Sequence, residues 1–366
     1  MIVGKRIKYL SVVVVCVVLT GCSEIESRTS IKRLGQVEKV ASRYPGLKIP
    51  VIDGQFKLVY SPDPENPKGW FINDHCLYLD EKGKIHFIGI ENKFPSTKEF
   101  TSKYDIDEFL EDEPERTFME TLSYILHFHA YDRDEINTHY RLGHAVADNI
   151  WGPWEKKEAI FGGEGGTDFY GSNFIVKHEE KYYMLLDSEM TMAMSSDLYN
   201  WEKFNPPHHP GANIAGWRDP CVIKLEDGTY LQYFAGESDN PEKYGEVVNL
   251  SVSKDMVNWE MIEPCYSTRV SEVDFGLFES PFVYKKDGLY YLFVCFAHQR
   301  YYQTFVVVSD DPYHFPTENV ITTLFTHAPE LIEIDGVTYI SSCGIEDPQI
   351  MNFTGLWIAK LKWMEP

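Results

Sequence analysis

A hairpin pattern recurs five times along this chain of 366 residues, and it constrains the fold more than any other feature. Each copy is an apolar strand, a short turn and a second strand rich in aromatic residues. Three of the five turns contain Asp-Gly, which favours tight hairpins because glycine readily adopts a positive φ. The copies occupy residues 77–89, 174–186, 222–234, 282–294 and 331–343.

A second element follows each of the first four hairpins: a strand, an Asp-containing turn and an aromatic residue. The aromatic residues stand 47, 58 and 56 positions apart, at Trp154, Trp201, Trp259 and Phe315. Four strands per unit at this period are typical of propeller blades. The sequence therefore predicts an all-β, five-bladed β-propeller over residues 50–366. We expect residues 356–363 to form the third strand of the last blade and residues 56–62 to form its fourth, which closes the ring.

The first 21 residues have the pattern of a bacterial lipoprotein signal peptide. Lys5, Arg6 and Lys8 precede an apolar run at residues 10–19 that is too short to span a bilayer. Residues 19–22 (LTGC) resemble a lipobox, which implies cleavage before Cys22 and acylation of that residue; an ordinary secretory signal is the alternative. Residues 22–49 are then a tether. We expect a lipoprotein of the bacterial cell envelope, periplasm-facing or on the cell surface, that touches the membrane only through the lipid on Cys22.

Composition narrows the partners and the chemistry. With 56 Asp and Glu against 34 Lys and Arg, the formal net charge is −22, which disfavours nucleic acid and suits a neutral ligand. The cysteines beyond the signal are odd in number and form no CxxC motif, so we expect buried thiols rather than disulfides or a zinc cluster. They are Cys76, Cys221, Cys265, Cys295 and Cys343.

A common register places several carboxylates on one ring. The turn positions 83, 180, 228, 288 and 336 mark equivalent points of the five hairpins, and counting back nine residues leads to the start of each innermost strand. In a propeller these strand starts converge at one end of the central channel, where like charges raise one another's pKa. Two alternatives are capping of turn N–H groups and a metal site. The ring residues are Asp74, Gly171, Asp219, Glu279 and His327, and Glu330 is a further carboxylate candidate nearby.

Two carboxyl groups are what glycoside hydrolysis requires, one as an acid and one as a nucleophile or base. The segments around the ring residues resemble glycoside hydrolase family 32, the β-fructosidases, in four blocks that follow the family order. Residues 70–74 (WFIND) are similar to its Trp-Met-Asn-Asp-Pro block, and residues 218–220 match its Arg-Asp-Pro motif. Residues 278–281 (FESP) are similar to its Glu-Cys-Pro motif, and residues 169–172 (FYGS) to its Phe-Ser-Gly-Ser block.

The resemblance to family 32 implies roles for individual residues. Asp74 would be the nucleophile, Glu279 the acid/base, and Asp219 the residue that binds sugar hydroxyls and stabilises the transition state. The further residues expected to bind substrate are Trp70, Asn73, Ser172, Arg218, His298 and His327.

The chain also departs from family 32. His75 replaces a proline, Ser280 replaces a cysteine, and no room is left for a C-terminal β-sandwich. A single propeller is more similar to family 43, the arabinanases and xylosidases, in which Asp74 would be a general base, Asp219 a pKa modulator and Glu279 the acid. We expect no cofactor to be required; a structural Ca²⁺ at the propeller axis, near His327, is the metal that this second resemblance implies.

Together these features predict a glycoside hydrolase that cleaves neutral furanosyl linkages, fructosyl or arabinosyl, in oligosaccharides or polysaccharides. One alternative is an inverting enzyme similar to family 43, an arabinofuranosidase or xylosidase with Asp74 as base. Another is a non-catalytic, glycan-binding surface lipoprotein. A charged insertion at residues 91–130 would cross one face of the propeller, either as a lid or as an inert decoration.

Overall fold

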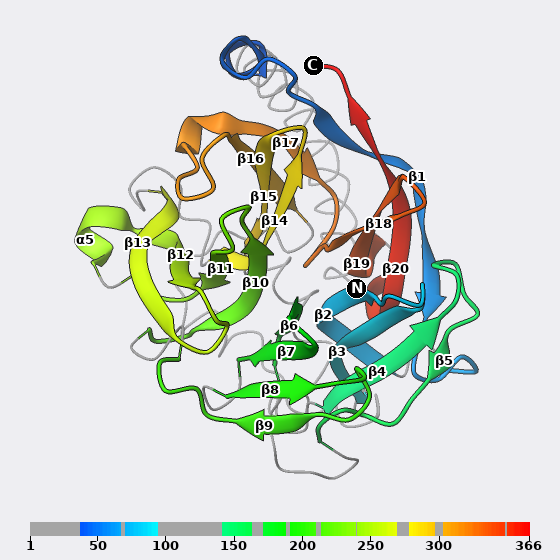
Figure 1. Cartoon of the computed structure of the whole chain (residues 1–366). Coiled ribbons are helices and arrows are strands. Elements are labelled where there is room, and N and C mark those ends of the chain that lie inside the picture. The colour runs from blue at the N-terminus through cyan, green and yellow to red at the C-terminus, as the bar shows by residue number, and fades with distance from the viewer. Residues whose placement is uncertain are drawn as a thin grey trace, which may run out of the picture.

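The computed structural model describes residues 37–66, 70–93, 141–162, 171–187, 191–209, 214–238, 240–268, 278–296, 303–347 and 350–366. This part of the chain forms five four-stranded antiparallel sheets arranged around a central axis (Figure 1). The predicted five-bladed β-propeller is confirmed. The signal segment, Cys22, the first part of the tether and most of the 91–130 insertion lie outside the described residues.

Each blade is a meander whose first strand is innermost (Figure 1). Blade 1 contains β2 (Trp70–Leu79), β3 (Ile85–Lys93), β4 (Arg141–Ala147) and β5 (Glu155–Lys156). Blade 2 contains β6 (Asn173–His178), β7 (Lys181–Leu186), β8 (Met192–Ser195) and β9 (Glu202–Phe204). Blade 3 contains β10 (Arg218–Lys224), β11 (Tyr230–Ala235), β12 (Glu246–Ser253) and β13 (Trp259–Thr268), with a short helix α5 (Pro241–Tyr244) before β12.

The remaining two blades complete the ring. Blade 4 contains β14 (Phe278–Lys286), β15 (Leu289–Phe296), β16 (Thr304–Ser309) and β17 (Val320–Leu324), with the 3₁₀ turn η3 (Thr317–Asn319) before β17. Blade 5 contains β18 (Leu331–Ile334), β19 (Val337–Asp347), β20 (Ile350–Met364) and β1 (Ile49–Tyr60).

The hairpin turns of blades 4 and 5 have the backbone that their Asp-Gly sequences predict, whereas in the Asp-Gly turn of blade 3 only Gly228 has a positive φ. In blade 4, Asp287 and Gly288 have φ values of 51° and 85°; in blade 5, Asp335 and Gly336 have 51° and 76°. Positive φ at both central residues is the condition for the type I′ turns that suit the twist of a hairpin. The register on which the ring prediction rests is therefore present in the fold.

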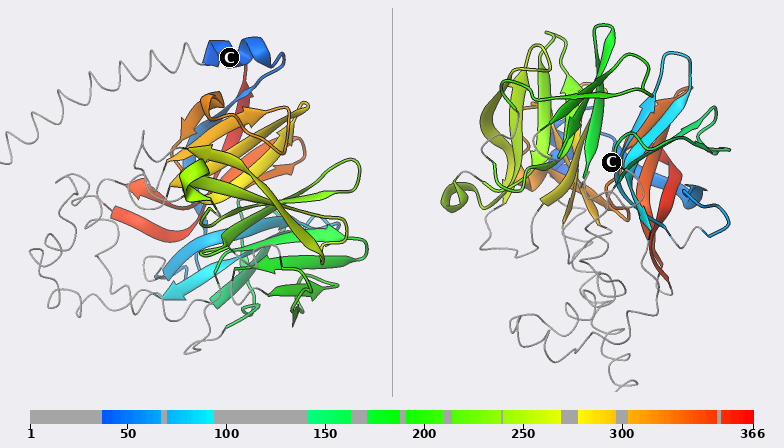
Figure 2. Two further views of the ribbon diagram at one scale, coloured as in Figure 1. Left: turned by 90° about the vertical axis from the view of Figure 1, so that its left-hand side faces the viewer. Right: turned by 90° about the horizontal axis from the view of Figure 1, so that it is seen from below.

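The N-terminal strand closes the propeller. β1 pairs with β20 from Ile49 opposite Met364 to Tyr60 opposite Leu356, so both strands are longer than the predicted ones. Beyond Leu356, the tip of the β19–β20 hairpin pairs only within itself, up to Asp347 opposite Ile350, and it projects from the blade (Figure 2).

The end of the predicted tether differs from our expectation, because it packs on the propeller. Residues 37–43 are helical, and Val40 and Leu47 are 0% and 1% exposed within the core of blades 4 and 5. Asn319 donates a hydrogen bond to the hydroxyl of Tyr44 at 3.1 Å. Apolar residues at positions 40, 44 and 47 lie on one face of this short segment, which explains its docking.

The strand, Asp turn and aromatic units form a second repeated structure. In blade 3, Asp255 Oδ1 accepts hydrogen bonds from the backbone N–H groups of Val257 at 2.9 Å and Asn258 at 2.8 Å. The indole of Trp259 donates to the carbonyl of Met256 at 3.1 Å. Blade 2 repeats these bonds around Asp197. These Asp turns tie the outer strands of their blades together.

Aromatic and aliphatic side chains fill the space within and between the blades. Among the largest fully buried side chains are Tyr230, Tyr233, Phe87 and Phe293. The five cysteines predicted to be buried thiols are indeed free and buried. In the part of the chain that the structure describes, no helix has both the length and the apolar character needed to cross a membrane.

Candidate active site

Irregularities in the strand pairing determine where the three ring carboxylates lie. In the innermost strands of blades 1, 3 and 4 the pairing with the next strand shifts at or directly after the predicted ring position: between Ile72 and His75, between Arg218 and Cys221, and between Glu279 and Phe282. A bulge redirects a side chain and ends regular pairing, and such bulges are common beside active sites. The ring prediction thus corresponds to one structural feature repeated in three blades.

Two of these bulges contain residues in the left-handed region. Asp219 has a φ of 55°, and Ser280, directly after Glu279, has a φ of 46°. Non-glycine residues in this region are strained unless their surroundings hold them, and they gather at functional sites.

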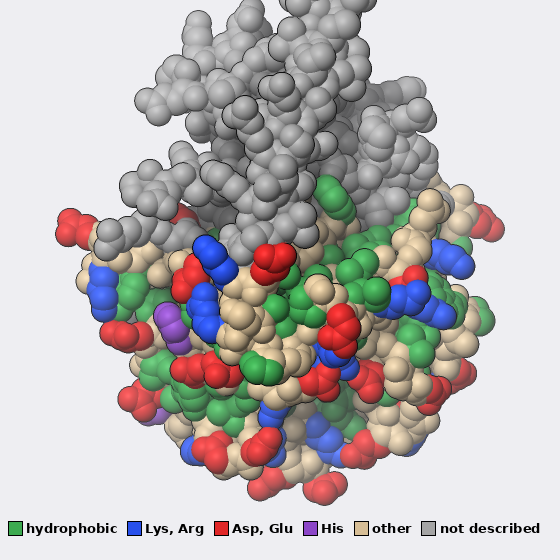
Figure 3. Space-filling view, turned by 90° about the horizontal axis from the view of Figure 1, so that it is seen from above, with side chains coloured by type: hydrophobic (Ala, Val, Ile, Leu, Met, Phe, Trp, Pro, Cys, Tyr) green, Lys and Arg blue, Asp and Glu red, His purple; other side chains and the backbone are tan. Residues whose placement is uncertain are grey.

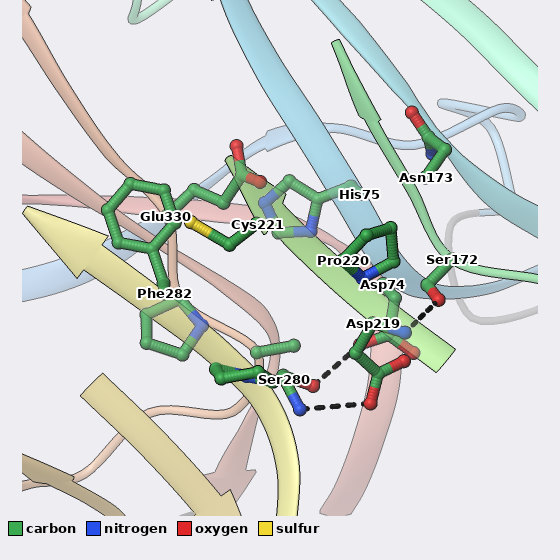
Figure 4. A pocket seen from close by; sticks show the side chains of 13 residues that line it. Asp74, His75, Ser172, Asn173, Asp219, Pro220, Cys221, Ser280, Phe282 and Glu330 are labelled. Atoms are coloured by element: carbon green, nitrogen blue, oxygen red, sulfur yellow. Dashed lines mark hydrogen bonds between the residues drawn. The ribbon is translucent and has the colours of Figure 1, made fainter. Parts of the chain in front are cut away.

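Hydrogen bonds connect the ring residues from blade to blade (Figure 4). The backbone N–H of Asp219 donates to Ser172 Oγ at 2.7 Å, linking blades 3 and 2. The backbone N–H of Ser280 donates to Asp219 Oδ2 at 2.9 Å, linking blades 4 and 3. The Ser280 hydroxyl donates to Asp74 Oδ1 at 2.8 Å, linking blades 4 and 1. The two aspartates are therefore held by a continuous network.

A guanidinium group lies among the carboxylates. Arg218 Nε is 3.5 Å from Asp219 Oδ2, and its Nη2 is 3.7 Å from Glu279 Oε1. The same Nη2 donates to the carbonyl of Phe278 at 3.1 Å, which fixes the side chain against blade 4. Arg218 thus contributes one positive charge at the place where the predicted carboxylates meet.

Burial and repulsion between charges raise the pKa values of Asp74 and Glu279, so these two carboxyl groups tend to retain protons. Burial, followed by the charges of Asp219 and Glu279, raises the pKa of Asp74 well above its usual range. Burial raises the pKa of Glu279 to about 7, although the nearby Arg218 charge opposes the rise. Because the charge of Glu279 repels that of Asp74, a proton on Glu279 favours ionisation of Asp74. The site can therefore hold one neutral acid beside one anionic carboxylate.

A fourth carboxylate, which our sequence analysis missed, occupies the ring position of blade 2. Gly171 has no side chain there, and an added Cβ would lie 2.0 Å from Asp187 Oδ1. Asp187 directly follows β7, and Ser172 Oγ donates to its Oδ2 at 3.0 Å. Burial, with repulsion from Asp219, raises the pKa of Asp187 to about 7. The position that the sequence left open is filled from the neighbouring strand.

The other predicted substrate-binding residues have different surroundings. The ring of Trp70 is 6% exposed and is contacted by the Arg141 guanidinium at 4.7 Å and the Lys156 ammonium at 4.8 Å. This packing inside blade 1 differs from the expected role in lining the sugar site. His327 is 1% exposed, and its backbone N–H donates to Ser342 Oγ at 3.2 Å.

The last three residues predicted to bind substrate are Asn73, Ser172 and His298. Asn73 is half-buried within the β2 bulge, next to Asp74. Ser172 lies in the hydrogen-bond network described above, where its hydroxyl bonds Asp187 and the Asp219 backbone. His298 lies outside the residues that the structure describes.

Behind the ring lies a small axial cavity of about 30 Å³, which is room for about two water molecules. Asp74, Asp219 and Ser172 line one part of it, and His75 and Glu330 line another (Figure 4). The cavity therefore joins the ring carboxylates to polar groups deeper in the channel.

Those deeper groups join blade 5 to blade 1. His75 Nε2 is 2.8 Å from Ser341 Oγ, and its Nδ1 is 3.1 Å from Cys343 Sγ. Burial lowers the pKa of His75 to about 3, so the imidazole is neutral. Glu330 Oε2 accepts the backbone N–H of Leu77 at 2.7 Å, and burial raises its pKa to about 8. Both side chains therefore connect blade 5 to blade 1 through hydrogen bonds.

The channel residues do not fit the Ca²⁺ suggested by the sequence. Ca²⁺ takes six to eight oxygen ligands, whereas the axial lining includes the His75 imidazole, the Cys221 thiol and the Phe282 ring. Over the described ranges, no group of three or more His, Cys, Asp and Glu side chains is arranged to hold a metal ion. The groups at this site that can exchange protons with a substrate are its carboxyl groups.

Comparison with known proteins adds the fold relatives. No protein-family model and no curated protein matches the chain. Among solved structures, a family 32 β-fructofuranosidase of Bombyx mori is 18% identical, with a TM-score of 0.51 over 91% of this chain and 66% of that chain. A family 43 β-xylosidase/α-arabinofuranosidase from a compost microbial metagenome, solved with xylotriose, is 12% identical, with a TM-score of 0.51 over 86% and 95% of the two chains.

A third structure is a family 117 glycoside hydrolase of Zobellia galactanivorans. It is 10% identical, with a TM-score of 0.55 over 87% of this chain and 90% of that chain. Family 32, which the sequence blocks resemble, and family 43, which a single propeller resembles, are thus both among the structural relatives. The chain shares the five-bladed propeller fold of glycoside hydrolases from families 32, 43 and 117.

Proposed function

We propose that this protein is a glycoside hydrolase and that Asp74, Asp219 and Glu279 are its catalytic carboxylates. The observation that carries the proposal is the repeated bulge, which brings the three side chains from three blades together: Ser280 hydrogen-bonds Asp74 and Asp219, and Arg218 lies 3.5 Å from Asp219 and 3.7 Å from Glu279. Buried carboxyl groups without a use are costly, so such a group in a fold shared with glycoside hydrolases supports a catalytic role.

In this proposal the two reacting groups have opposite protonation states. Burial raises the pKa of Glu279 to about 7 and that of Asp74 well above its usual range, so the reactive form is the one in which Glu279 holds a proton and Asp74 does not. In that form Glu279 protonates the glycosidic oxygen as the bond to the anomeric carbon breaks. Asp74, ionised, either attacks the anomeric carbon or takes a proton from the attacking water. Proton loss from Glu279 leaves an anion that Arg218 stabilises at 3.7 Å.

Asp219 supports the reaction without exchanging a proton. Its carboxylate is held by the Ser280 N–H and its backbone by Ser172, so its free lone pairs point in fixed directions. A fixed carboxylate next to the sugar stabilises the positive charge that develops on the ring in the transition state.

The charge of the site favours a neutral sugar. Four carboxyl groups surround one guanidinium group, and anionic sugars would be repelled. Over the described part of the face in Figure 3, acidic side chains are spread among basic and apolar ones instead of forming one patch. The preference for neutral over anionic sugars is therefore attributed to the carboxyl groups of the ring. From the sequence blocks we propose furanosyl linkages, fructosyl or arabinosyl, as the first substrates to test.

One experiment tests the proposal directly. The protein is incubated with fructo-, arabino- and xylo-oligosaccharides, and the products are followed by NMR. We expect release of a monosaccharide, and its initial anomer assigns retention or inversion. Asp74→Asn and Glu279→Gln should each abolish release. Saturable sugar binding without release would indicate the non-catalytic alternative, and wild-type rates in both variants would overturn the assignment of the residues.

A membrane attachment through Cys22 is part of the same proposal. It predicts that the protein extracted from bacterial membranes carries an acylated N-terminal cysteine. Mass spectrometry of the N-terminal peptide, compared with a Cys22→Ser variant, would reveal the added lipid. An unmodified peptide that starts after an ordinary signal cleavage would contradict it.

A further inference from the structure

Blade 2 supplies its ring group in an unusual way. The ring carboxylates Asp74, Asp219 and Glu279 belong to innermost strands, whereas Gly171 leaves the space of its own side chain to the carboxyl group of Asp187. The fit is close, because an added Cβ would lie 2.0 to 2.3 Å from all three atoms of that carboxyl group. A carboxylate in this place is therefore incompatible with any larger residue at position 171.

We propose that Asp187 is a fourth functional carboxylate of the site, which positions Asp219 through one oxygen and binds a hydroxyl group of the sugar through the other. The positioning half stands on the geometry of the chain alone. The hydroxyl-binding half rests on the proposed function.

The positioning half, in which Asp187 positions Asp219, follows because the Ser172 hydroxyl has only one proton to donate. Ser172 donates that proton to Asp187 Oδ2 at 3.0 Å, so a lone pair of its Oγ faces the Asp219 N–H, 2.7 Å away. Asp219 holds a φ of 55°, a strained value that needs a fixed hydrogen bond. Asp187 thus orients the hydroxyl that holds the bulge of blade 3, and with it the Asp219 carboxylate.

The hydroxyl-binding half follows from the other oxygen. Asp187 Oδ1 is buried and has no hydrogen-bond partner among the described residues. Buried carboxylate oxygens are ordinarily paired, so one left open beside a ligand site is a natural acceptor for a ligand hydroxyl. The charge of Asp187 also acts on Asp74, Asp219 and Arg218, which places it in the same electrostatic cluster.

The proposal names a feature of the substrate. A carboxylate can accept hydrogen bonds from sugar hydroxyls, and it repels acidic substituents. The hydroxyl that meets Asp187 must therefore be free, and the site should reject a sugar that carries a methyl, acetyl or acidic group at that position.

Two substitutions separate the two halves. In Asp187→Asn the amide oxygen can still accept from Ser172, while the second oxygen and the negative charge are lost. In Asp187→Ala both functions are lost. Ser172→Ala removes the hydroxyl that bridges Asp187 and Asp219 but keeps the charge of Asp187, and Asp310→Asn, at an exposed turn, is the control for loss of one aspartate.

The first measurement needs no substrate: hydrogen exchange of the Asp219 amide at single-residue resolution in the full protein. We expect exchange at least tenfold faster in Asp187→Ala and Ser172→Ala, and within threefold of wild type in Asp187→Asn and Asp310→Asn. An unchanged rate in Asp187→Ala overturns the positioning role.

The second measurement uses an oligosaccharide that the wild type hydrolyses. We expect Asp187→Asn to raise KM at least tenfold while kcat changes less than KM, and Asp187→Ala to lower kcat as well. An unchanged KM in Asp187→Asn overturns hydroxyl binding. If the wild type hydrolyses no oligosaccharide and calorimetry detects no binding of L-arabinose or D-fructose, the proposed function and the hydroxyl-binding half both fail, whereas the exchange result still decides the positioning half.

Discussion

The same blades shift the pKa values of their acidic residues in opposite directions, downward in the Asp turns and upward at Glu279 in the axial ring. At Asp255, burial alone would raise the pKa, but hydrogen bonds from the backbone and side chain of Asn258 lower it to about 2. Asp197 in blade 2 has the same surroundings and a pKa lowered to about 2. At Glu279, burial dominates and the pKa rises to about 7. The turns supply donors for each negative charge, whereas the ring gathers charges that repel one another.

Within one repeated unit, the aspartates of the Asp turns therefore contribute to stability, and the carboxyl groups of the ring contribute to the proposed chemistry. An aspartate that accepts several hydrogen bonds in its charged form contributes to folding. A crowded, poorly satisfied carboxylate opposes folding, and proteins tolerate it where function requires it. Substitutions in the two regions should therefore have opposite effects on activity and on stability.

The largest effect is expected at Asp74. Asp74→Asn should lower kcat on the substrate identified above by about a thousandfold or more, because the nucleophile or base is lost. Its unfolding temperature should stay equal to or above that of the wild type, because one repelling charge leaves the ring. Enzyme assay and thermal unfolding of the same sample test both statements. A clear loss of stability would show that ring and turn carboxylates do not differ in this way.

The converse substitution is at Asp255. Asp255→Ala removes the acceptor of two backbone N–H groups and of the Asn258 amide, so we expect a loss of about 1–3 kcal/mol in the free energy of unfolding. Urea titration measures it, with Asp310→Asn as the matched control and Asp197→Ala as the equivalent change in blade 2. The kcat should remain within twofold of wild type. A large fall in kcat would mean that the turns and the ring are coupled.

The third effect is on the pH dependence of stability. Glu330 and Glu279, with pKa values raised to about 8 and about 7, bind more protons in the folded than in the unfolded state, so stability falls as pH rises towards 8. His75 and His144 have pKa values lowered to about 3, so they act in the opposite direction, but only below pH of about 6.5.

Above that pH the histidines no longer contribute, and the carboxyl groups make stability fall. The buried cysteine thiols, whose pKa values burial raises, add to the fall only as the pH approaches their ordinary value of about 8.5. Each such group contributes at most about 1.4 kcal/mol per pH unit. We expect Glu330→Gln to flatten the decline in unfolding temperature between pH of about 6.5 and 8.5, in scans on both proteins. Equal slopes in the two proteins would count against a buried, protonated Glu330.

The smallest effect is expected at Ser280. Its hydroxyl lowers the pKa of Asp74 against the larger effect of burial, so Ser280→Ala should raise that pKa. The acidic limb of the pH profile of kcat/KM should then shift upward by about one pH unit. Ser280→Cys, which keeps a weak donor, should shift it less. An unshifted limb in Ser280→Ala would show that Ser280 does not tune Asp74.

Much of the fold could be read from the sequence because blades are local structures. Each hairpin depends on its own turn residues, such as Asp287 and Gly288, and the register of that turn determines where the strand begins. The ring positions of Asp74, Asp219 and Glu279 followed from counting along single strands. The closing partner of β20 was also predictable, since a propeller leaves one strand to be supplied by the other end of the chain.

The rest depended on contacts between distant residues. Asp187 was missed because a neighbouring strand carries it into the space of Gly171. A signal was present in the sequence: seven residues after the turn marks stand the uncharged residues Ile90, Ala235, Cys295 and Cys343 in the other blades, and Asp187 in blade 2. The burial of Trp70 was equally invisible, because its cationic partners are supplied by later strands of the blade.

The pairing of β1 with β20 has a consequence for biogenesis. Ile49 and Met364 are far apart in the sequence but neighbours in one sheet, so blade 5 cannot be completed until β20 has been synthesised. His75 and Glu330 join that blade to blade 1, beside Asp74. A nascent chain that lacks β20 can therefore form separate hairpins without closing the blades around the carboxylate ring, so the ring is completed only after β20 has been made.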